Sequence, residues 1–231
     1  DLMCHIHDGD CIQLGIGAMP NLVGKMINET DLKDLGGNTE MLVDAYMDMW
    51  ESGKMNGRRK NVDDGKIVYT FTLGSQELYD WIDHNPALAS YNVGYVNHPA
   101  RVAQINNLIS INQGLEVDLY SQVNAESSGF RQISGNGGMS DFTLGAYWSE
   151  GGRSLICLPS TYKDKEGNVR SRIVPTLTPG SVTTVPRQMV HIIVTEYGWE
   201  SFKAVSTWAR TEKLIRLAQP DFRDDLIKEA E

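Results

Sequence analysis

Residues 11–20 read Cys-Ile-Gln-Leu-Gly-Ile-Gly-Ala-Met-Pro, and this stretch decides the fold class of the chain. Its first four residues are typical of a buried β-strand, and Gly15-Ile16-Gly17 predicts a tight turn. Apolar residues at helical spacing between Asn21 and Glu29 predict a helix directly afterwards. A strand that runs through a glycine turn into a helix leaves unpaired backbone N–H groups where the helix dipole favours an anion. The stretch therefore predicts an α/β fold with a site for a phosphate or an oxyanion.

Strand and helix patterns alternate along the rest of the chain. A strand, a glycine turn and a helix recur at residues 66–84, where Gly74 separates an apolar run from a helical one. Alternation of this kind indicates an α/β fold with an open mixed, largely parallel sheet flanked by helices. We expect strands at residues 11–14, 39–43, 66–73, 91–96, 108–111, 115–120, 155–158 and 191–195. We expect helices at 21–29, 45–53 and 75–84, a further helix that follows a turn at 97–99 and continues through about residue 107, and a helix at 211–231 that is broken at Pro220.

The composition excludes several classes of protein. The chain has 231 residues with 30 acidic and 21 basic side chains, and the net charge of -9 disfavours nucleic acid or an anionic membrane as partner. No run of about 18 apolar residues predicts a membrane span. Cys4, Cys11 and Cys157 are too few and too far apart for a disulfide framework, so we expect a reducing cytoplasm. We also expect one domain over residues 1–231, forming part of a larger polypeptide.

Several common sites are disfavoured by their motifs. A dinucleotide fingerprint needs a third glycine where this chain has Pro20, so a dinucleotide site is disfavoured. Taken alone, the first glycine turn is explained by a tight structural turn between a strand and a helix. A second glycine cluster, Gly135 to Gly138, favours a functional interpretation. His5 and His7 lie beside two aspartates, but we interpret this segment as a frayed terminus and expect no metal. No Gly-x-Ser-x-Gly motif of a serine hydrolase occurs.

Two carboxylates compete for a catalytic role. Glu116 lies in an alternating segment, Glu-Val-Asp-Leu-Tyr, where an outward-facing acidic residue is ordinary. Glu40 follows a glycine-rich bend at Gly36-Gly37 and lies at a predicted strand end, about two dozen residues after the first glycine turn. The residues alone therefore favour Glu40 modestly.

Short runs of glycine, polar and acidic residues span nearly the whole chain: Gln13–Pro20, Thr39-Glu40-Met41, Asn97-His98-Pro99, Ser134–Phe142, Ser171–Pro175, Val194–Gly198 and Pro220–Arg223. Together they closely resemble the C-terminal half of acetyl-CoA hydrolase/transferase family proteins, which have the NagB/RpiA/CoA-transferase-like fold. Leu42–Tyr46, Gly74–Trp81 and Ala125–Gly129 are most similar to the butyryl-CoA:acetate and 4-hydroxybutyrate CoA-transferases of that family.

The resemblance implies a role for each matching residue. Glu40 would be the nucleophile of a ping-pong CoA transfer through a glutamyl-CoA thioester, without ATP, a metal or a tightly bound cofactor. The side-chain amide of Asn97 and the backbone N–H of Gly138 would stabilise the oxyanion of each tetrahedral intermediate. Leu115 would line the CoA site. The CoA-contacting residues are expected to be Gly15, Ile16, Gly17, Ala18, Met19 and Gly138, together with Leu115.

The resemblance also identifies the partners and the alternatives. The substrates would be acyl-CoA and a short-chain carboxylate such as acetate, and a homo-oligomer is expected. Family members carry an N-terminal domain of similar fold that this chain lacks, and their active site lies between the two halves. The sequence departs from the usual family pattern at two places. Gly36-Gly37-Asn38 stands where many members have Gly-Ile-His or Gly-Met-His, and Trp199–Phe202 replaces a more usual Val-Asn-Leu-like stretch. An acyl-CoA hydrolase, or a CoA-binding fragment inactive without its N-terminal half, are the alternatives, and acyl-chain length is left open.

Overall fold

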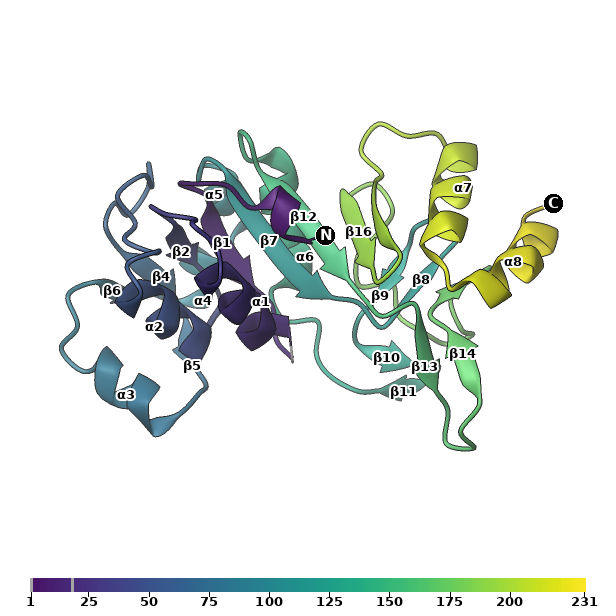
Figure 1. Cartoon of the computed structure of the whole chain (residues 1–231), viewed down its shortest axis with the longest axis horizontal. Coiled ribbons are helices and arrows are strands. Elements are labelled where there is room, and N and C mark those ends of the chain that lie inside the picture. Colours follow the sequence, from purple (N-terminus) through teal and green to yellow (C-terminus); the bar gives the residue numbers. More distant parts are fainter. Residues whose placement is uncertain (1, 18) are drawn as a thin grey trace. The chain divides into compact units, whose positions relative to one another are not determined.

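A computed structural model describes residues 2–17 and 19–231 and, for residues 19–21, the backbone alone (Figure 1). The chain forms two compact units. The amino-terminal unit comprises residues 2–112 and 141–154, and the carboxy-terminal unit comprises residues 113–140 and 155–231. Helix α6 and strand β12 each continue from one unit into the other along the chain.

The amino-terminal unit is built on parallel strands in the order β7-β1-β2-β4-β6. In the centre, Ile12 pairs with Gly37 on one side and with Ile109 on the other. The strands are β1 (Cys11–Leu14), β2 (Gly36–Asn38), β4 (Ile67–Tyr69), β6 (Leu88–Ser90) and β7 (Leu108–Gln113), and a separate parallel pair is formed by β3 (Met41–Leu42) and β5 (Phe71–Thr72).

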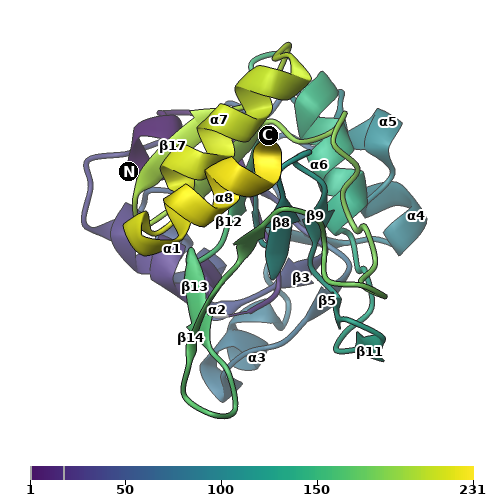
Figure 2. The ribbon, with the colours of Figure 1, turned by 90° about the vertical axis from the view of Figure 1, so that its right-hand side faces the viewer.

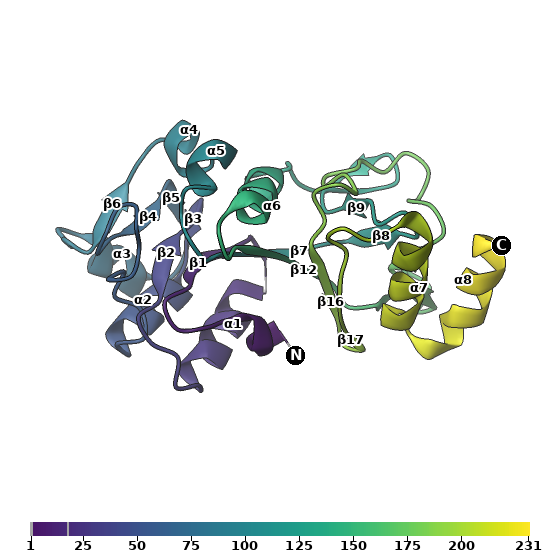
Figure 3. The same cartoon turned by 90° about the horizontal axis from the view of Figure 1, so that it is seen from above.

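Helices cover both faces of this sheet (Figure 3). Figure 3 shows α1 and α2 along one face and α4, α5 and α6 along the other. The helices are η1 (Leu2–His5, a 3-10 turn), α1 (Met19–Asn28), α2 (Asp44–Glu51), α3 (Gln76–Ile82), α4 (Val93–Val96), α5 (Pro99–Val102) and α6 (Met139–Trp148). Helix α1 packs closely on α2, because a β-carbon on Gly24 would lie 2.5 Å from the β-carbon of Ala45. The expected strand, turn and helix of residues 11–29 are therefore confirmed.

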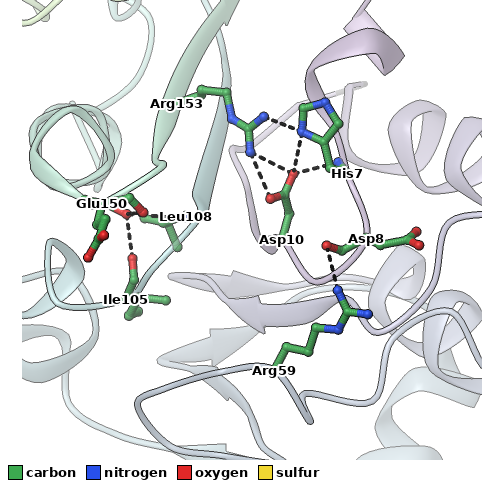
Figure 4. A network of polar contacts seen from close by, with 9 residues as sticks. His7, Asp8, Asp10, Arg59, Ile105, Leu108, Glu150 and Arg153 are labelled. Atoms are coloured by element: carbon green, nitrogen blue, oxygen red, sulfur yellow. Dashed lines mark hydrogen bonds and ion pairs between the residues drawn. The ribbon is translucent and has the colours of Figure 1, made fainter.

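The amino end of β1 is fixed by a buried ion pair (Figure 4). Arg153 donates to both carboxylate oxygens of Asp10 at 2.8 and 3.0 Å, and Asp10 also accepts from the backbone N–H of His7. The side chain of Asp10 is only 3% exposed. The prediction of a frayed terminus is wrong, because this ion pair and the 3-10 turn Leu2–His5 order the segment.

The carboxy-terminal unit contains strand β12 (Arg153–Cys157) beside parallel β16 (Ile192–Thr195), to which β17 (Gly198–Ser201) pairs antiparallel. Its core is a cluster of buried apolar side chains that includes Val117, Ile156 and Phe202. Figure 2 shows the β13–β14 hairpin projecting from this unit. The remaining elements are β8 (Glu116–Asp118), β9 (Val123–Asn124), β10 (Ser127–Ser128), β11 (Arg131–Gln132), β13 (Thr161–Lys163), β14 (Val169–Ser171), β15 (Ile173–Val174), α7 (Thr207–Leu217), η2 (Pro220–Phe222, a 3-10 turn) and α8 (Arg223–Ala230).

The predicted α/β class and the mixed, largely parallel sheet with flanking helices are confirmed, since β16 and β17 supply the antiparallel pair. Two element predictions are wrong. The predicted strand 91–96 is instead helix α4 over Val93–Val96, because the side chain of Asn92 accepts from the N–H of Tyr95 and caps the helix. The helix expected between the turn at 97–99 and about residue 107 is α-helical only over Pro99–Val102.

Candidate functional site

Glu40 lies where two parallel strand pairs are interrupted. Strand β2 ends at Asn38 and β3 begins at Met41, while the neighbouring β4 ends at Tyr69 and β5 begins at Phe71. The sequence predicted one strand over 66–73, and the structure divides it at Thr70. The reason is local, because the N–H groups of Thr70 and Phe71 both donate to the carbonyl oxygen of Glu40, at 3.0 and 3.1 Å. The interruption places Glu40 at the carboxyl end of β2.

The backbone around Glu40 is held from both sides. The hydroxyl of Thr39 donates to the carbonyl oxygens of Leu14 and Met41 at 3.3 and 3.1 Å, and the N–H of Thr39 donates to the carbonyl of Val68 at 2.9 Å. Thr39 is fully buried, whereas Glu40 is half-buried. These hydrogen bonds fix the backbone from which the Glu40 side chain extends.

Asn97 and His98 are brought to the same region by Asn38. The side-chain amide of Asn38 donates to the carbonyl oxygen of Val96 at 3.4 Å, which joins the end of β2 to the end of α4. Asn97 follows directly and is 3% exposed, and its Oδ1 is buried without a hydrogen-bond partner. The predicted oxyanion donor is therefore a buried amide one residue beyond the link to β2.

Asp141 is a residue of this site that the sequence interpretation missed. It lies in the first turn of α6, within electrostatic range of Glu40 and His98. Burial, and next the charge of Glu40, raise the pKa of the Asp141 carboxyl, while His98 lowers it. Its position in the run Ser134–Phe142 was the only sequence signal that could have pointed to it.

The first glycine turn is held tightly against β7. The N–H of Gly15 donates to the carbonyl of Ile111 at 2.7 Å, and Gly17 has a positive φ of 123°, which a glycine adopts readily. Ile16 and Gly17 are exposed, so the predicted CoA-contacting turn presents its backbone to solvent. Ala18 lies outside the described residues, and Met19 begins the backbone of α1.

Gly138 and Leu115 belong to the carboxy-terminal unit. Gly138 is buried immediately before α6, the helix that carries Asp141. Leu115 is half-buried, and its carbonyl accepts from Arg172 at 2.7 Å. Glu116 lies in β8, where its carboxylate accepts from the N–H and the hydroxyl of Thr178, at 3.0 and 2.5 Å. Glu116 is thus engaged in a local structural contact.

Residues 2–17 and 19–231 contain no group of three or more His, Cys, Asp or Glu side chains that could hold a metal ion. Within the same ranges, every helix is too short or too polar to cross a membrane.

The comparison with known proteins agrees with this fold. Residues 74–230 match the acetyl-CoA hydrolase/transferase C-terminal domain, and the chain belongs to that family. It is 58% identical over 226 residues to the probable butyrate:acetyl-CoA coenzyme A-transferase of Syntrophomonas wolfei, covering 98% of this chain and 50% of the relative. It is 55% identical to the butyryl-CoA:acetate CoA-transferase of Anaerostipes caccae, with 98% and 51% covered. The chain therefore spans about half the length of these relatives.

The chain is also similar to a solved CoA-transferase structure and, more distantly, to a hydrolase. The 4-hydroxybutyrate CoA-transferase of Porphyromonas gingivalis superposes with a TM-score of 0.82 at 36% identity, over 99% of this chain and 53% of that chain. The acetyl-CoA hydrolase of Yarrowia lipolytica is 28% identical over 94% of this chain and 39% of the relative. The resemblance to the transferases stated from the motifs is confirmed, and the hydrolase is the more distant relative.

Proposed function

We propose that this chain is the C-terminal domain, residues 1–231, of a CoA-transferase that moves CoA between a short-chain acyl-CoA and acetate. The observation that carries the proposal is the place of Glu40, a half-buried carboxylate on a fixed backbone at the break between β2 and β3. The similarity to butyrate and 4-hydroxybutyrate transferases supports butyryl-CoA or 4-hydroxybutyryl-CoA as the acyl donor.

In the proposed mechanism, the Glu40 carboxylate attacks the thioester carbonyl, and the C–S bond breaks to leave a mixed anhydride and CoA thiolate. The thiolate then attacks the glutamyl carbonyl, forming the glutamyl-CoA thioester and releasing the acyl group as its carboxylate. Acetate takes the CoA by the same two steps in reverse order. Each step conserves the activated acyl bond, so no ATP hydrolysis is required.

The amide of Asn97 and the N–H of Gly138 are the proposed donors to the oxyanion of each tetrahedral intermediate. A preorganised donor of this kind is worth about 3 kcal/mol to the transition state. The exposed turn at residues 15–17, continuing through Ala18 and Met19, is the proposed contact for CoA together with Leu115. The buried position of Asn97 supports its role, because water competes poorly for a buried donor.

The partners follow from the length of the relatives. An N-terminal CoA-transferase domain is proposed to complete the active site, because the relatives are about twice as long. The few and widely spaced cysteines, Cys4, Cys11 and Cys157, support a cytoplasmic location. A homo-oligomeric state stays a prediction.

Trapping the intermediate tests the proposed function. The chain is incubated with butyryl-CoA, with and without the N-terminal half of the Syntrophomonas wolfei relative, and then reduced with borohydride for mass spectrometry. A glutamyl-CoA adduct at Glu40, and its reduction to the alcohol, are expected. Glu40→Gln should abolish both, whereas Glu116→Gln, the matched control, should retain them. Labelling at Glu116, or none with the partner half present, would contradict the assignment.

The same mixture separates transferase from hydrolase. With acetate present, a transferase yields acetyl-CoA, because acetate resolves the glutamyl thioester. A hydrolase yields free CoA at the same rate with or without acetate. The 28% identity to the hydrolase, against 58% to the transferase, supports the first outcome.

A further inference from the structure

Asp63 connects the two short helices that flank Asn97, α4 and α5 (Figure 3). Its carboxylate oxygens accept from the hydroxyl of Tyr95 at 3.1 and 3.3 Å, and the same carboxylate forms an ion pair with Arg101. Tyr95 belongs to α4 and Arg101 to α5, and the Arg101 guanidinium lies over the Tyr95 ring, 4.7 Å from its centroid. One carboxylate therefore holds α4 and α5 together.

The junction between the two helices leaves Asn97 little freedom once both helices are held. The N–H of Asn97 donates to the carbonyl of Val93 at 3.0 Å, which makes Asn97 the C-cap of α4. The carbonyl of the next residue, His98, accepts from the N–H groups of Arg101 and Val102 at 2.8 and 2.9 Å, so α5 begins there. A displacement of either helix would consequently move Asn97.

The loop that supplies Asp63 is also bound to the strand that leads to Glu40. Lys60, three residues before Asp63, is buried and donates to the carbonyl of Gly37 in β2 at 3.0 Å. Asp63 has a φ of 50°, in the left-handed region, which costs free energy in residues other than glycine and is maintained by surrounding contacts. The loop thus ties α4 and α5 to the strand that ends before Glu40.

The ion pair of Asp63 and Arg101 has no substitute nearby. Within residues 2–17 and 19–231, Asp63 is the only ion-pair partner of Arg101, and Nε and Nη1 of Arg101 are buried without a hydrogen-bond partner. Both side chains are largely buried. Because an unpaired buried charge is costly, a guanidinium that loses its carboxylate moves toward water or another acceptor. A change at Asp63 would therefore displace α5 and also release α4.

We propose that Asp63 is a positioning residue, which holds α4 and α5 so that the side-chain amide of Asn97 keeps a fixed place for the oxyanion. This inference rests on the proposed function, in which Asn97 is an oxyanion donor. Asp63 acts through Asn97, because its own carboxylate is engaged by Tyr95 and Arg101. A donor that is fixed in advance stabilises the transition state without being reorganised during the reaction.

The placement of the Asn97 amide can be measured without any reaction. In heteronuclear NMR spectra of the 231-residue chain, the side-chain amide signals of Asn97 are those that Asn97→Ala removes. Asp63→Asn should shift and broaden these signals, because Asn97 then exchanges between positions. Asp34→Asn is the matched control and should leave them unchanged, since Asp34 also has a positive φ but binds Asn56 and Arg59. Unchanged Asn97 signals in Asp63→Asn would overturn the proposal.

The rate of thioester formation tests the consequence, in the presence of butyryl-CoA and the N-terminal half. Asp63→Asn should lower the rate at saturating butyryl-CoA by about 10- to 100-fold and change the half-saturating concentration by less than about twofold, because a misplaced donor weakens the transition state and leaves substrate binding intact. In the Asn97→Ala background, Asp63→Asn should cause no further loss, since the residue through which it acts is gone. Losses that add up in the double variant would overturn the proposal, because a purely structural defect would slow both backgrounds.

Tyr95→Phe keeps the proposal testable if Asp63→Asn does not fold. This change removes one hydroxyl and retains both the ion pair of Asp63 with Arg101 and the ring beneath the guanidinium. It should lower the same rate by about two- to tenfold, since one neutral hydrogen bond is lost. If Asp63→Asn is unfolded, a wild-type rate in Tyr95→Phe would overturn the proposal.

The two failures are distinguishable. If the wild type forms no thioester with the N-terminal half, the proposed function is overturned, and this inference falls with it. If the wild type forms thioester and a folded Asp63→Asn forms it at the same rate, the inference alone is overturned.

Discussion

A β-carbon on Gly15 would lie 2.4 Å from Oδ1 of Asn112, so the glycine turn after β1 lies in direct contact with the Asn112 side chain of β7. Asn112 belongs to a network with Gln13 and Ser110, in which Gln13 Oε1 accepts from Ser110 at 2.7 Å and from Asn112 at 3.2 Å. All three side chains are buried. The turn therefore cannot gain a side chain without disturbing a satisfied polar network.

Gly15→Ala should lower the free energy of unfolding by about 1 to 3 kcal/mol, because overpacking displaces Asn112 from its partners. Chemical denaturation monitored by circular dichroism measures this loss. Gly135→Ala is the matched control, since a β-carbon there meets nothing within 4 Å, and it should change stability by less than about 0.5 kcal/mol. Equal stability of Gly15→Ala and the wild type would contradict this prediction, because it would mean that the turn accommodates the extra methyl group without displacing Asn112.

Tyr46 fixes α2 to β1 by two hydrogen bonds. Its hydroxyl accepts from the N–H of Leu14 at 3.0 Å and donates to the carbonyl of Ile12 at 3.3 Å, and the side chain is fully buried. Tyr46→Phe should cost about 1 to 3 kcal/mol, because both backbone groups lose their partner away from water. The partly exposed Tyr79→Phe, which loses one 3.3 Å bond, should cost less when both are unfolded in urea.

The first glycine turn and the strand end beside Glu40 were predictable because their signals are local. A strand, two glycines and a helix occupy one continuous stretch, and Glu40 follows its own glycine bend. Asp141 was not predictable, because its environment depends on Glu40 and His98, which lie about 100 and 43 residues earlier in the chain. No spacing rule joins these three positions.

Lys60 is a second residue whose environment the sequence pattern did not predict. The run Arg58-Arg59-Lys60 predicts a solvated loop, yet Lys60 is 6% exposed and donates to the carbonyls of Gly37 and Lys66. The cause is the absent side chain of Gly36, whose β-carbon would lie 2.6 Å from Cγ of Lys60. The aliphatic part of the Lys60 side chain fills the space beside Gly36. A pattern of charges along the sequence does not reveal such packing.

The ion pair of Asp10 and Arg153 should show strong coupling in a double-mutant cycle. Their side chains are 3% and 19% exposed, so Asp10→Asn or Arg153→Met alone should cost about 3 kcal/mol by leaving one buried group without its partner. The double substitution should cost clearly less than the sum. Thermal and urea unfolding of the wild type, the two single variants and the double variant measure the coupling. If the two single losses in free energy of unfolding simply add up in the double variant, the interaction between Asp10 and Arg153 does not contribute to stability.

Asn97→Ala should slow thioester formation with little loss of fold. Loss of one oxyanion donor lowers such rates by about 10²- to 10³-fold, whereas the Oδ1 of Asn97 has no hydrogen bond to lose. Rapid-quench trapping of the glutamyl thioester, with the N-terminal half supplied, measures the rate. The exposed Asn106→Ala is the control and should match the wild type, and a wild-type rate in Asn97→Ala would exclude the donor role.

Glu200 should give stability that depends on pH in the acid range. Burial raises the pKa of its carboxyl, but the hydrogen bonds and charges of Arg216 and Lys213, at 2.8 and 2.6 Å, outweigh burial and hold the pKa below its ordinary 4.5. A carboxylate with a lowered pKa in the folded state stabilises the protein above its unfolded pKa, and this contribution is lost as the pH falls through the folded value.

Glu200→Gln should therefore reduce the free energy of unfolding by about 1 kcal/mol at pH 6 and above, because Glu200 is only 19% exposed and has two cationic partners. The difference from the wild type should shrink as the pH falls below 4.5. Urea unfolding between pH 3 and 7 measures it. Glu212→Gln, on the exposed side of the same α7 helix, should show no such dependence, and a difference that stays constant with pH in Glu200→Gln would exclude the ion-pair origin.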